Sequence, residues 1–234
     1  MVASIIIPMA VVLGLALVIA VVVYFAFRLR SGEPINISFR LLLTAYFYLL
    51  TIAGLIVLLV GLSGLVNAGL GAVLGRDFSY TRPPVARPIP VTPEGIPQKT
   101  APSPEEQRLQ AERQQERQSR EGLLQGGSMA VIGGIVWALH SLGRRRMEEG
   151  EERAASFLRM GYLLVLLAVS SLVSMITLSS GVFETLRFYL VESVNEFEFR
   201  SPPGQNVSAA VVFTPVWAYY LLALLRGLRR RRGP

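Results

Sequence analysis

The sequence contains no cysteine and only one histidine, His140. The absence of thiols excludes disulfides, thiolate metal sites, cysteine nucleophiles and iron–sulfur ligation. One histidine cannot build a bis-histidine haem site or a multi-histidine metal site without a partner subunit. The sequence also lacks a glycine-rich phosphate loop, a nucleophile–base pair and paired catalytic carboxylates on a suitable scaffold. We therefore expect a protein that is not an enzyme and that binds no cofactor or metal.

Charge is missing from long stretches of the chain, although 52% of its residues are hydrophobic. The charge-free blocks are residues 1–27, 41–75, 122–143, 160–183 and 201–225. Each block can supply the roughly 20 apolar residues that a helix needs to cross a hydrocarbon core of about 30 Å. Spans must be helical because lipid offers no partner to an unpaired backbone amide. The sequence predicts an all-α polytopic membrane protein with five transmembrane helices.

The predicted spans have approximate limits that follow these blocks. They are residues 4–27, 39–65, 123–142, 157–183 and 207–225. No basic segment precedes the first span, and Arg28 and Arg30 follow it. This order is typical of a retained anchor helix with its N-terminus outside, here residues 1–30, rather than of a cleaved signal peptide.

Proline is concentrated in residues 82–104, within a polar segment over 76–121. This composition predicts an extended arm. Ser103 and Glu106 match a capping box, which predicts a helix over residues 107–121 that feeds into the third span. Arg108/Glu112 and Glu116/Arg120 stand at i,i+4 spacing along it. The arm and its helix are either a solvated spacer or a docking element for a partner.

Small residues recur every four positions along the third span. They are Gly126, Ala130, Gly134 and Ala138. This spacing predicts a helix-packing face, so the third span should be central in the bundle. Glycines also accumulate toward the far end of the second span, where we expect tight packing followed by a bend or fraying.

The distribution of basic residues predicts the orientation. Segments 28–40, 144–159 and 226–232 carry three, five and five Lys or Arg, whereas 184–200 carries two and a net charge of −2. An N-outside, C-inside topology in the cytoplasmic (inner) membrane satisfies this count, although segment 76–121 fits it least well. The basic clusters are Arg144, Arg145, Arg146, Arg229, Arg230, Arg231 and Arg232. We expect them to meet the anionic lipid leaflet and not nucleic acid.

Apolar residues continue at helical spacing beyond the fourth span, at Phe183, Leu186 and Leu190. This pattern predicts an amphipathic continuation outside the bilayer, with Glu184 and Arg187 available to its wet side.

Two aromatic signatures occur twice. Tyr46 and Tyr162 stand near the start of the second and fourth spans, and Trp137 and Trp217 stand near the end of the third and fifth. The predicted domains are therefore two parallel helical hairpins, residues 39–143 and 156–228, followed by a basic tail over 229–234. The predicted interfacial anchors are Tyr46, Trp137, His140, Tyr162, Trp217 and Tyr220.

At these residues the chain resembles a bacterial family of integral-membrane domains of unknown function. Members of that family carry a tyrosine-rich helix start and a later Trp-x-x-His helix end followed by basic residues. The first copy here reads Trp137-Ala138-Leu139-His140, whereas the second copy has Tyr220 in place of the histidine. The resemblance covers both hairpins and implies the architecture.

Two functions remain open. The first is a non-catalytic membrane scaffold or accessory subunit that contacts the lipid bilayer and other membrane subunits. The second is a pore or carrier for a neutral or apolar solute, formed by the hairpins or by a homo-oligomer. Its candidate lining is polar residues of the fourth span, namely Ser170, Ser171, Ser174, Thr177, Ser179 and Ser180. No span contains the charged group that ion-coupled transporters usually require.

Overall fold

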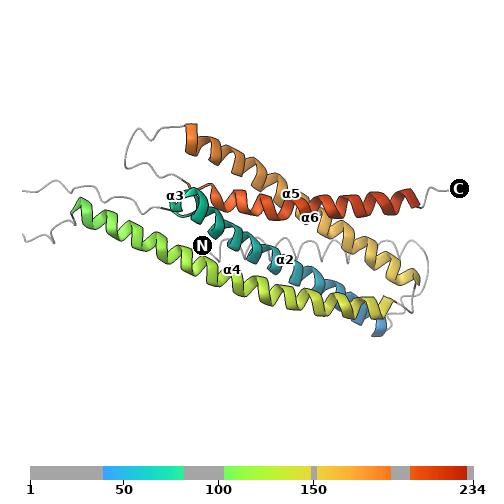
Figure 1. The fold of residues 1–234 in the computed structure, drawn as a ribbon. Coiled ribbons are helices and arrows are strands. Elements are labelled where there is room, and N and C mark those ends of the chain that lie inside the picture. The colour runs from blue at the N-terminus through green and yellow to red at the C-terminus, as the bar shows by residue number, and fades with distance from the viewer. Residues whose placement is uncertain (1–38, 82–102, 149–151, 191–200, 231–234) are drawn as a thin grey trace, which may run out of the picture. The chain divides into compact units, whose positions relative to one another are not determined.

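The computed structural model describes residues 39–81, 103–148, 152–190 and 201–230. Its helices are α2 (Phe39–Leu74), α3 (Arg76–Ser79), α4 (Pro104–Glu148), α5 (Glu152–Leu190) and α6 (Gly204–Arg230) (Figure 1). These ranges contain no strand. The chain is therefore all-helical wherever the structure describes it.

Each long helix carries a stretch that is long and apolar enough to cross a membrane. These four stretches are Leu43–Leu74, Glu105–Arg146, Arg159–Leu190 and Gly204–Gly227. They correspond to the second to fifth predicted spans. The predicted anchor helix over residues 1–30, most of the proline-rich arm and the end of the basic tail lie outside the described residues, so the five-span topology stays a prediction.

Each long helix contributes to two structural units. The first unit comprises Met1–Val57, Ile132–Val173 and Thr214–Pro234, and the second comprises Leu58–Val131 and Ser174–Phe213. The candidate site lies in the first unit, and the polar half of α4, residues 104–122, lies in the second.

Helix α2 continues for nine residues beyond the predicted limit near residue 65 and ends at Leu74. Its glycines are tolerated because packing, rather than propensity, stabilises a buried helix. The break comes at Gly75, which has φ 102° and ψ 150°. That conformation is open almost exclusively to glycine. The chain then turns into α3, where the Tyr80 amide donates to the Arg76 carbonyl at 2.8 Å.

Replacing Gly75 by alanine should lower the free energy of unfolding by about 1–3 kcal/mol, since a Cβ strains this backbone conformation. Gly69→Ala is the matched control, because Gly69 is helical and a Cβ there would meet nothing within 4 Å. Thermal unfolding in mild detergent measures both. Equal midpoints for the two variants would contradict the role given to Gly75.

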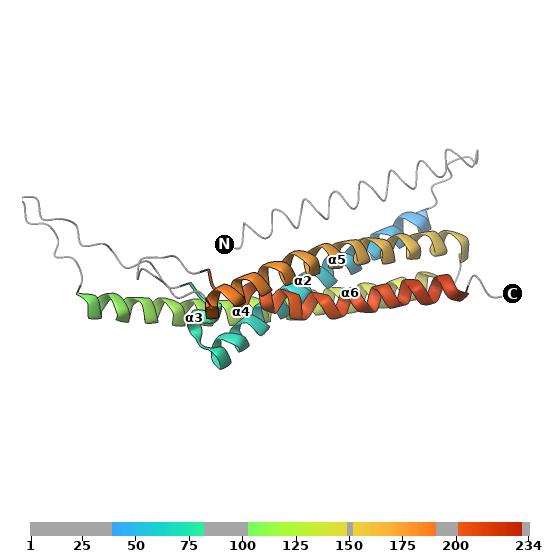
Figure 2. The ribbon, with the colours of Figure 1, turned by 90° about the horizontal axis from the view of Figure 1, so that it is seen from above.

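Helix α4 is a single unbroken helix, as Figure 1 shows, and Figure 2 gives a second view of its first turns, drawn in green. The predicted polar helix and the predicted third span are parts of it. The predicted capping box is confirmed: the Ser103 amide donates to Glu106 Oε2 at 2.8 Å and the Glu106 amide donates to Ser103 Oγ at 3.2 Å. The predicted Glu116–Arg120 pair forms at 2.7 Å. A second pair, Arg117–Glu121 at 2.8 Å, was not predicted.

In the second unit, glycines bring α2 and α4 into backbone contact. A Cβ on Gly61 would collide with the backbone of Ala130, and a Cβ on Gly64 would lie 3.3 Å from the Gly126 Cα. Gly126 in turn faces the Gly61 carbonyl, at 3.0 Å from its own Cβ position. Two residues of the predicted small face, Gly126 and Ala130, thus pack directly on α2. Only small residues permit so close an approach of two helices.

Polar groups fix α3 in the second unit. Ser79 Oγ donates to the Asn67 carbonyl at 2.9 Å. The buried Gln115 of α4 donates to Asp77 Oδ1 at 2.7 Å. The Tyr80 ring lies next to Gly71, 2.9 Å from its Cβ position. The base of the polar half of α4 is therefore hydrogen-bonded to the turn that follows α2.

The end of α5 differs from the amphipathic arrangement that the sequence predicts. Glu184 is half-buried and accepts a hydrogen bond from Asn206 Nδ2 of α6 at 2.8 Å. The Phe78 ring of α3 contacts Phe188 at 5.7 Å between centroids. Phe183 and Leu186, in contrast, are exposed. The expectation that Glu184 faces water is thus wrong, because α6 offers it an amide partner.

Candidate functional site

Four side chains, one from each long helix, lie together in the first unit. We call them the tyrosine–arginine cluster: Tyr48 of α2, Arg144 of α4, Tyr162 of α5 and Tyr220 of α6. The Arg144 guanidinium carbon lies 5.0 Å from the centre of the Tyr48 ring and 4.6 Å from that of Tyr162. The rings of Tyr48 and Tyr162 meet edge-on at 5.3 Å. Tyr162 and Tyr220 bring their hydroxyls to 3.3 Å. All three tyrosines are buried.

The guanidinium and the tyrosines of the cluster can be buried at low energetic cost. A guanidinium is planar and weakly hydrated, so it lies against aromatic faces at lower desolvation cost than an ammonium. A buried tyrosine usually needs a hydrogen-bond partner, and here Tyr162 and Tyr220 supply it to each other. The cluster joins four helices.

Arg144 corrects one sequence expectation. The sequence predicts that this residue faces the lipid headgroups, but it is half-buried and covers two tyrosine rings. Its neighbours Arg145 and Arg146 are exposed, as expected for that role. The difference follows from helix geometry, since successive residues point about a quarter-turn apart and only one of the three can face the bundle.

His140 lies beside the cluster, in the same unit. Its Nδ1 lies 2.8 Å from the Val136 carbonyl, one turn earlier in α4. Its ring contacts Tyr46 at 5.9 Å and Phe47 at 5.8 Å between centroids. Across the part of the chain that the structure describes, no group of three or more His, Cys, Asp or Glu residues could hold a metal ion. The contacts of His140 are those of a packed side chain.

The six predicted anchors divide between the surface and the interior. Tyr46 and Trp137 are exposed, and Trp217 and His140 are half-buried. Tyr162 and Tyr220 are buried in the cluster. Their depth relative to the headgroups stays a prediction. Tyr48 was missed, although the Tyr-Phe-Tyr run at 46–48 signalled it; two tyrosines at i,i+2 cannot face the same way, and only the first was chosen.

The two helix pairs that the aromatic signatures relate make corresponding contacts. Tyr46 meets His140 edge-on at 5.9 Å and 67°, and Tyr162 meets Tyr220 edge-on at 6.2 Å and 80°. The position of His140 in the first signature is that of Tyr220 in the second. The same contact is thus built once with an imidazole and once with a phenol.

Removing the Tyr220 hydroxyl, as in Tyr220→Phe, should lower the free energy of unfolding by about 1 kcal/mol. A buried hydrogen bond contributes about that much, and Tyr162 would lose its hydrogen-bond partner. Tyr219→Phe is the matched control, since Tyr219 is the preceding residue and is exposed. We expect Tyr220→Phe to lower the unfolding midpoint measurably and Tyr219→Phe to leave it unchanged. Indistinguishable variants would show that the hydroxyl contact adds nothing to stability.

Several hydroxyls within the spans bond to their own helix. Ser170 Oγ donates to the Leu166 carbonyl at 2.6 Å, and Thr51 Oγ1 donates to the Phe47 carbonyl at 2.7 Å. Thr177 Oγ1 donates to the Ser174 carbonyl at 3.4 Å. Such bonds satisfy a hydroxyl inside a helix bundle without lining a water path.

Comparison with known proteins identifies one segment. Residues 104–203 match the model of a family described as a domain of unknown function (DUF5671). The matched segment contains the whole of α4 and α5, one helix from each of the two predicted hairpins. It also contains Arg144 and Tyr162, the two cluster residues in closest cation–π contact. No curated protein and no solved structure matches the chain.

Proposed function

We propose that the protein is a non-catalytic scaffold or accessory subunit of a larger membrane complex, and that the polar half of α4 is its docking element. One observation carries the proposal: α4 continues without a break from its apolar half into a polar half that the bundle leaves largely exposed. Of the residues between Pro104 and Gly122, only Ala111 and Gln115 are buried.

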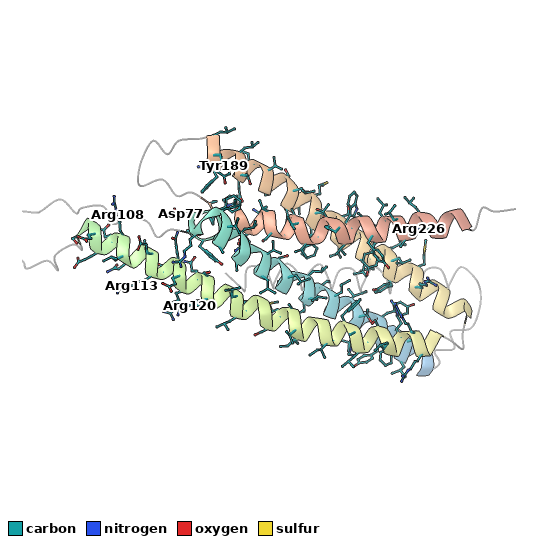
Figure 3. All side chains as sticks on the ribbon, viewed as in Figure 1. Asp77, Arg108, Arg113, Arg120, Tyr189 and Arg226 are labelled. Carbon is teal, nitrogen blue, oxygen red and sulfur yellow. The ribbon has the colours of Figure 1, made fainter. Side chains whose placement is uncertain are left out.

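The polar half of α4 has the length and the fixed base that a docking element needs. From Pro104 to Gly122 it extends about 28 Å at the rise of an α-helix. Its first turn is capped by Ser103 and Glu106, and its base is hydrogen-bonded to α3 through Gln115. Arg108, Arg113 and Arg120 project from it (Figure 3). A partner would find charged groups on a preformed helix, which reduces the ordering cost of binding.

The membrane arrangement that we propose adds an anchor helix over residues 1–30 to the four spans. It places the N-terminus outside and the C-terminus inside the cytoplasmic membrane of a bacterium, with two parallel hairpins. The matching contacts of Tyr46 with His140 and of Tyr162 with Tyr220 support the repeat. In this arrangement the polar half of α4 lies on the outer side of the membrane, where partner domains would meet it.

A pore or carrier for a neutral solute is the alternative, and it has less support. Its candidate lining residues Ser170 and Thr177 donate to carbonyls of their own helix. Ser174 is buried, and its hydroxyl has no partner among the described side chains. One such hydroxyl does not make a path across the bilayer.

Charge reversal on the polar half of α4 tests the proposal. Arg108 and Arg113 are exposed, so replacing both with glutamate should leave the helix intact while changing the docking surface. We expect recovery of co-purifying proteins from mild detergent to fall at least tenfold. Arg226→Glu, an exposed charge on α6, is the control and should leave recovery unchanged. Equal recovery of co-purifying proteins with the unaltered protein, the double variant and Arg226→Glu would contradict a docking role for this surface.

A further inference from the structure

An exposed apolar stripe continues along α5 past the point where its charges begin. Its members in the second unit are Met175, Ile176, Val182, Phe183, Leu186, Tyr189 and Leu190, each more than half exposed. They recur at three- and four-residue spacing, which places them on one face of the helix. Figure 3 shows Tyr189 on the last turns of α5. The stripe is therefore continuous with the lipid-facing surface around Met175.

The charged residues in these turns lie on a different face. Glu184 is half-buried and bonded to Asn206, and Arg187 is half-buried as well. Neither interrupts the stripe. The exposed surface of α5 consequently stays apolar for about 9 Å beyond Glu184, six residues at 1.5 Å each.

Contacts within the second unit show which residue of α4 lies at the same level as Glu184. Asn206, its partner, lies two residues after Gly204, whose Cβ position is 2.6 Å from Asn67 Oδ1 of α2. Three residues before Asn67, Gly64 packs on Gly126 of α4. Glu184 therefore lies close to the level of Gly126. Glu121, the innermost charged residue in the polar half of α4, is five residues before Gly126 and therefore about 7.5 Å farther out.

Helix α2 leads to the same level independently. Its exposed Val73 and Leu74 extend past Asn67, and the next charged residues along the chain, Arg76 and Asp77, come only in α3. Phe78 of α3 contacts Tyr189 at 6.5 Å between ring centroids. Exposed charge thus begins near the level of Tyr189 on α3 and on α4 alike.

From these levels we infer that the last two turns of α5, residues 182–190, lie in the bilayer. The phospholipid boundary meets α5 at Tyr189 and Leu190, a depth that amphipathic aromatic rings favour. The Glu184–Asn206 hydrogen bond is then a polar link between α5 and α6 that lies below the membrane surface. Polar side chains at such depth typically face a partner inside the bundle. The inference rests on the membrane location in the proposed function and not on the scaffold role.

The cysteine-free sequence permits a direct test of depth. Single cysteines at Leu186 and Leu190, in the full chain reconstituted into phospholipid vesicles, would carry a nitroxide spin label. Collision with oxygen, which concentrates in lipid, is compared with collision with a water-soluble nickel chelate. Met175→Cys supplies the lipid reference, and Gln110→Cys, exposed on the polar half of α4, supplies the water reference.

We expect the label at Leu186 to match the Met175 reference, with nickel collisions at least several-fold below those at Gln110, and the label at Leu190 to be intermediate. Nickel accessibility at Leu186 equal to that at Gln110 would overturn the inference, because these turns would then be in water. Protection of Leu186 from both reagents would also overturn it, since protein would cover the stripe. In either case recovery of partners by the α4 variants would be unaffected, so the scaffold proposal is tested separately.

Discussion

Replacing Gly126 by leucine should lower the free energy of unfolding by about 3 kcal/mol, the upper range for overpacking a filled interior. The Cβ alone would lie 3.0 Å from the Gly61 carbonyl oxygen and 3.1 Å from the Leu65 amide nitrogen. Both are backbone atoms, so no side-chain rotation can relieve the contact. The two helices would have to separate, which would also loosen the contact of Ala130 with Gly61.

The neighbouring residue is the control for this experiment. A Cβ on Gly127 would meet nothing within 4 Å. Gly127→Leu has the same change in composition and helix propensity, so it should leave stability unchanged or raise it slightly. Thermal unfolding in mild detergent, followed by circular dichroism, compares the two variants. A Gly126→Leu protein as stable as Gly127→Leu would show that α2 and α4 do not pack through these glycines.

Replacing Arg144 by glutamine should lower the free energy of unfolding by about 2 kcal/mol. The guanidinium covers two buried rings, and a desolvated cation–π contact contributes about that much. Arg144→Lys should fall between, since an ammonium cannot lie flat on both rings. The matched control is Arg145→Gln, which removes the same charge from an exposed position and should change stability by less than about 0.5 kcal/mol.

The pair also distinguishes two roles of the basic cluster. If Arg144 acted only through headgroup attraction, Arg144→Gln and Arg145→Gln would have equal effects, and added salt would weaken both. A loss confined to Arg144 and insensitive to salt supports the cluster. Equal, salt-sensitive losses would contradict it.

The sequence predicts the helices well and their contacts only in part. Charge-free blocks located four spans because one charged side chain in hydrocarbon is costly, so composition constrains position directly. The capping box at Ser103 and Glu106 was predictable because its partners are three residues apart. The end of α2 was not, because a buried helix does not depend on the propensities that glycine lowers.

The candidate site shows a different limit. Aromatic rings near a span end favour the interface, which predicts Tyr162 and Tyr220 as anchors, but position in a span does not determine which way a side chain points. Arg144 was grouped with Arg145 and Arg146 for the same reason. The sequence places Glu184 in water because its partner, Asn206, is 22 residues away along the chain. Long-range pairings of this kind become visible only when the helices are assembled.

The proposed docking element lies outside the tyrosine–arginine cluster. The tyrosine–arginine cluster joins α2, α4, α5 and α6 within the first unit, and its residues contact one another. The polar half of α4 belongs to the second unit and exposes most of its residues. The segment that matches the DUF5671 model includes both the polar half of α4 and Arg144. This division suits a protein in which packing holds a helix that another subunit recognises.

The most direct measurement of the scaffold role is site-specific photo-crosslinking in native membranes. A photoreactive residue at Gln110, exposed on the polar half of α4, is compared with one at Met175 on the lipid-facing side of α5. The account predicts a discrete crosslinked product at Gln110 that contains a second, different polypeptide, lost in the Arg108→Glu, Arg113→Glu variant, and none at Met175. Crosslinks at Gln110 only to lipid, or only to further copies of the same chain, would contradict the account.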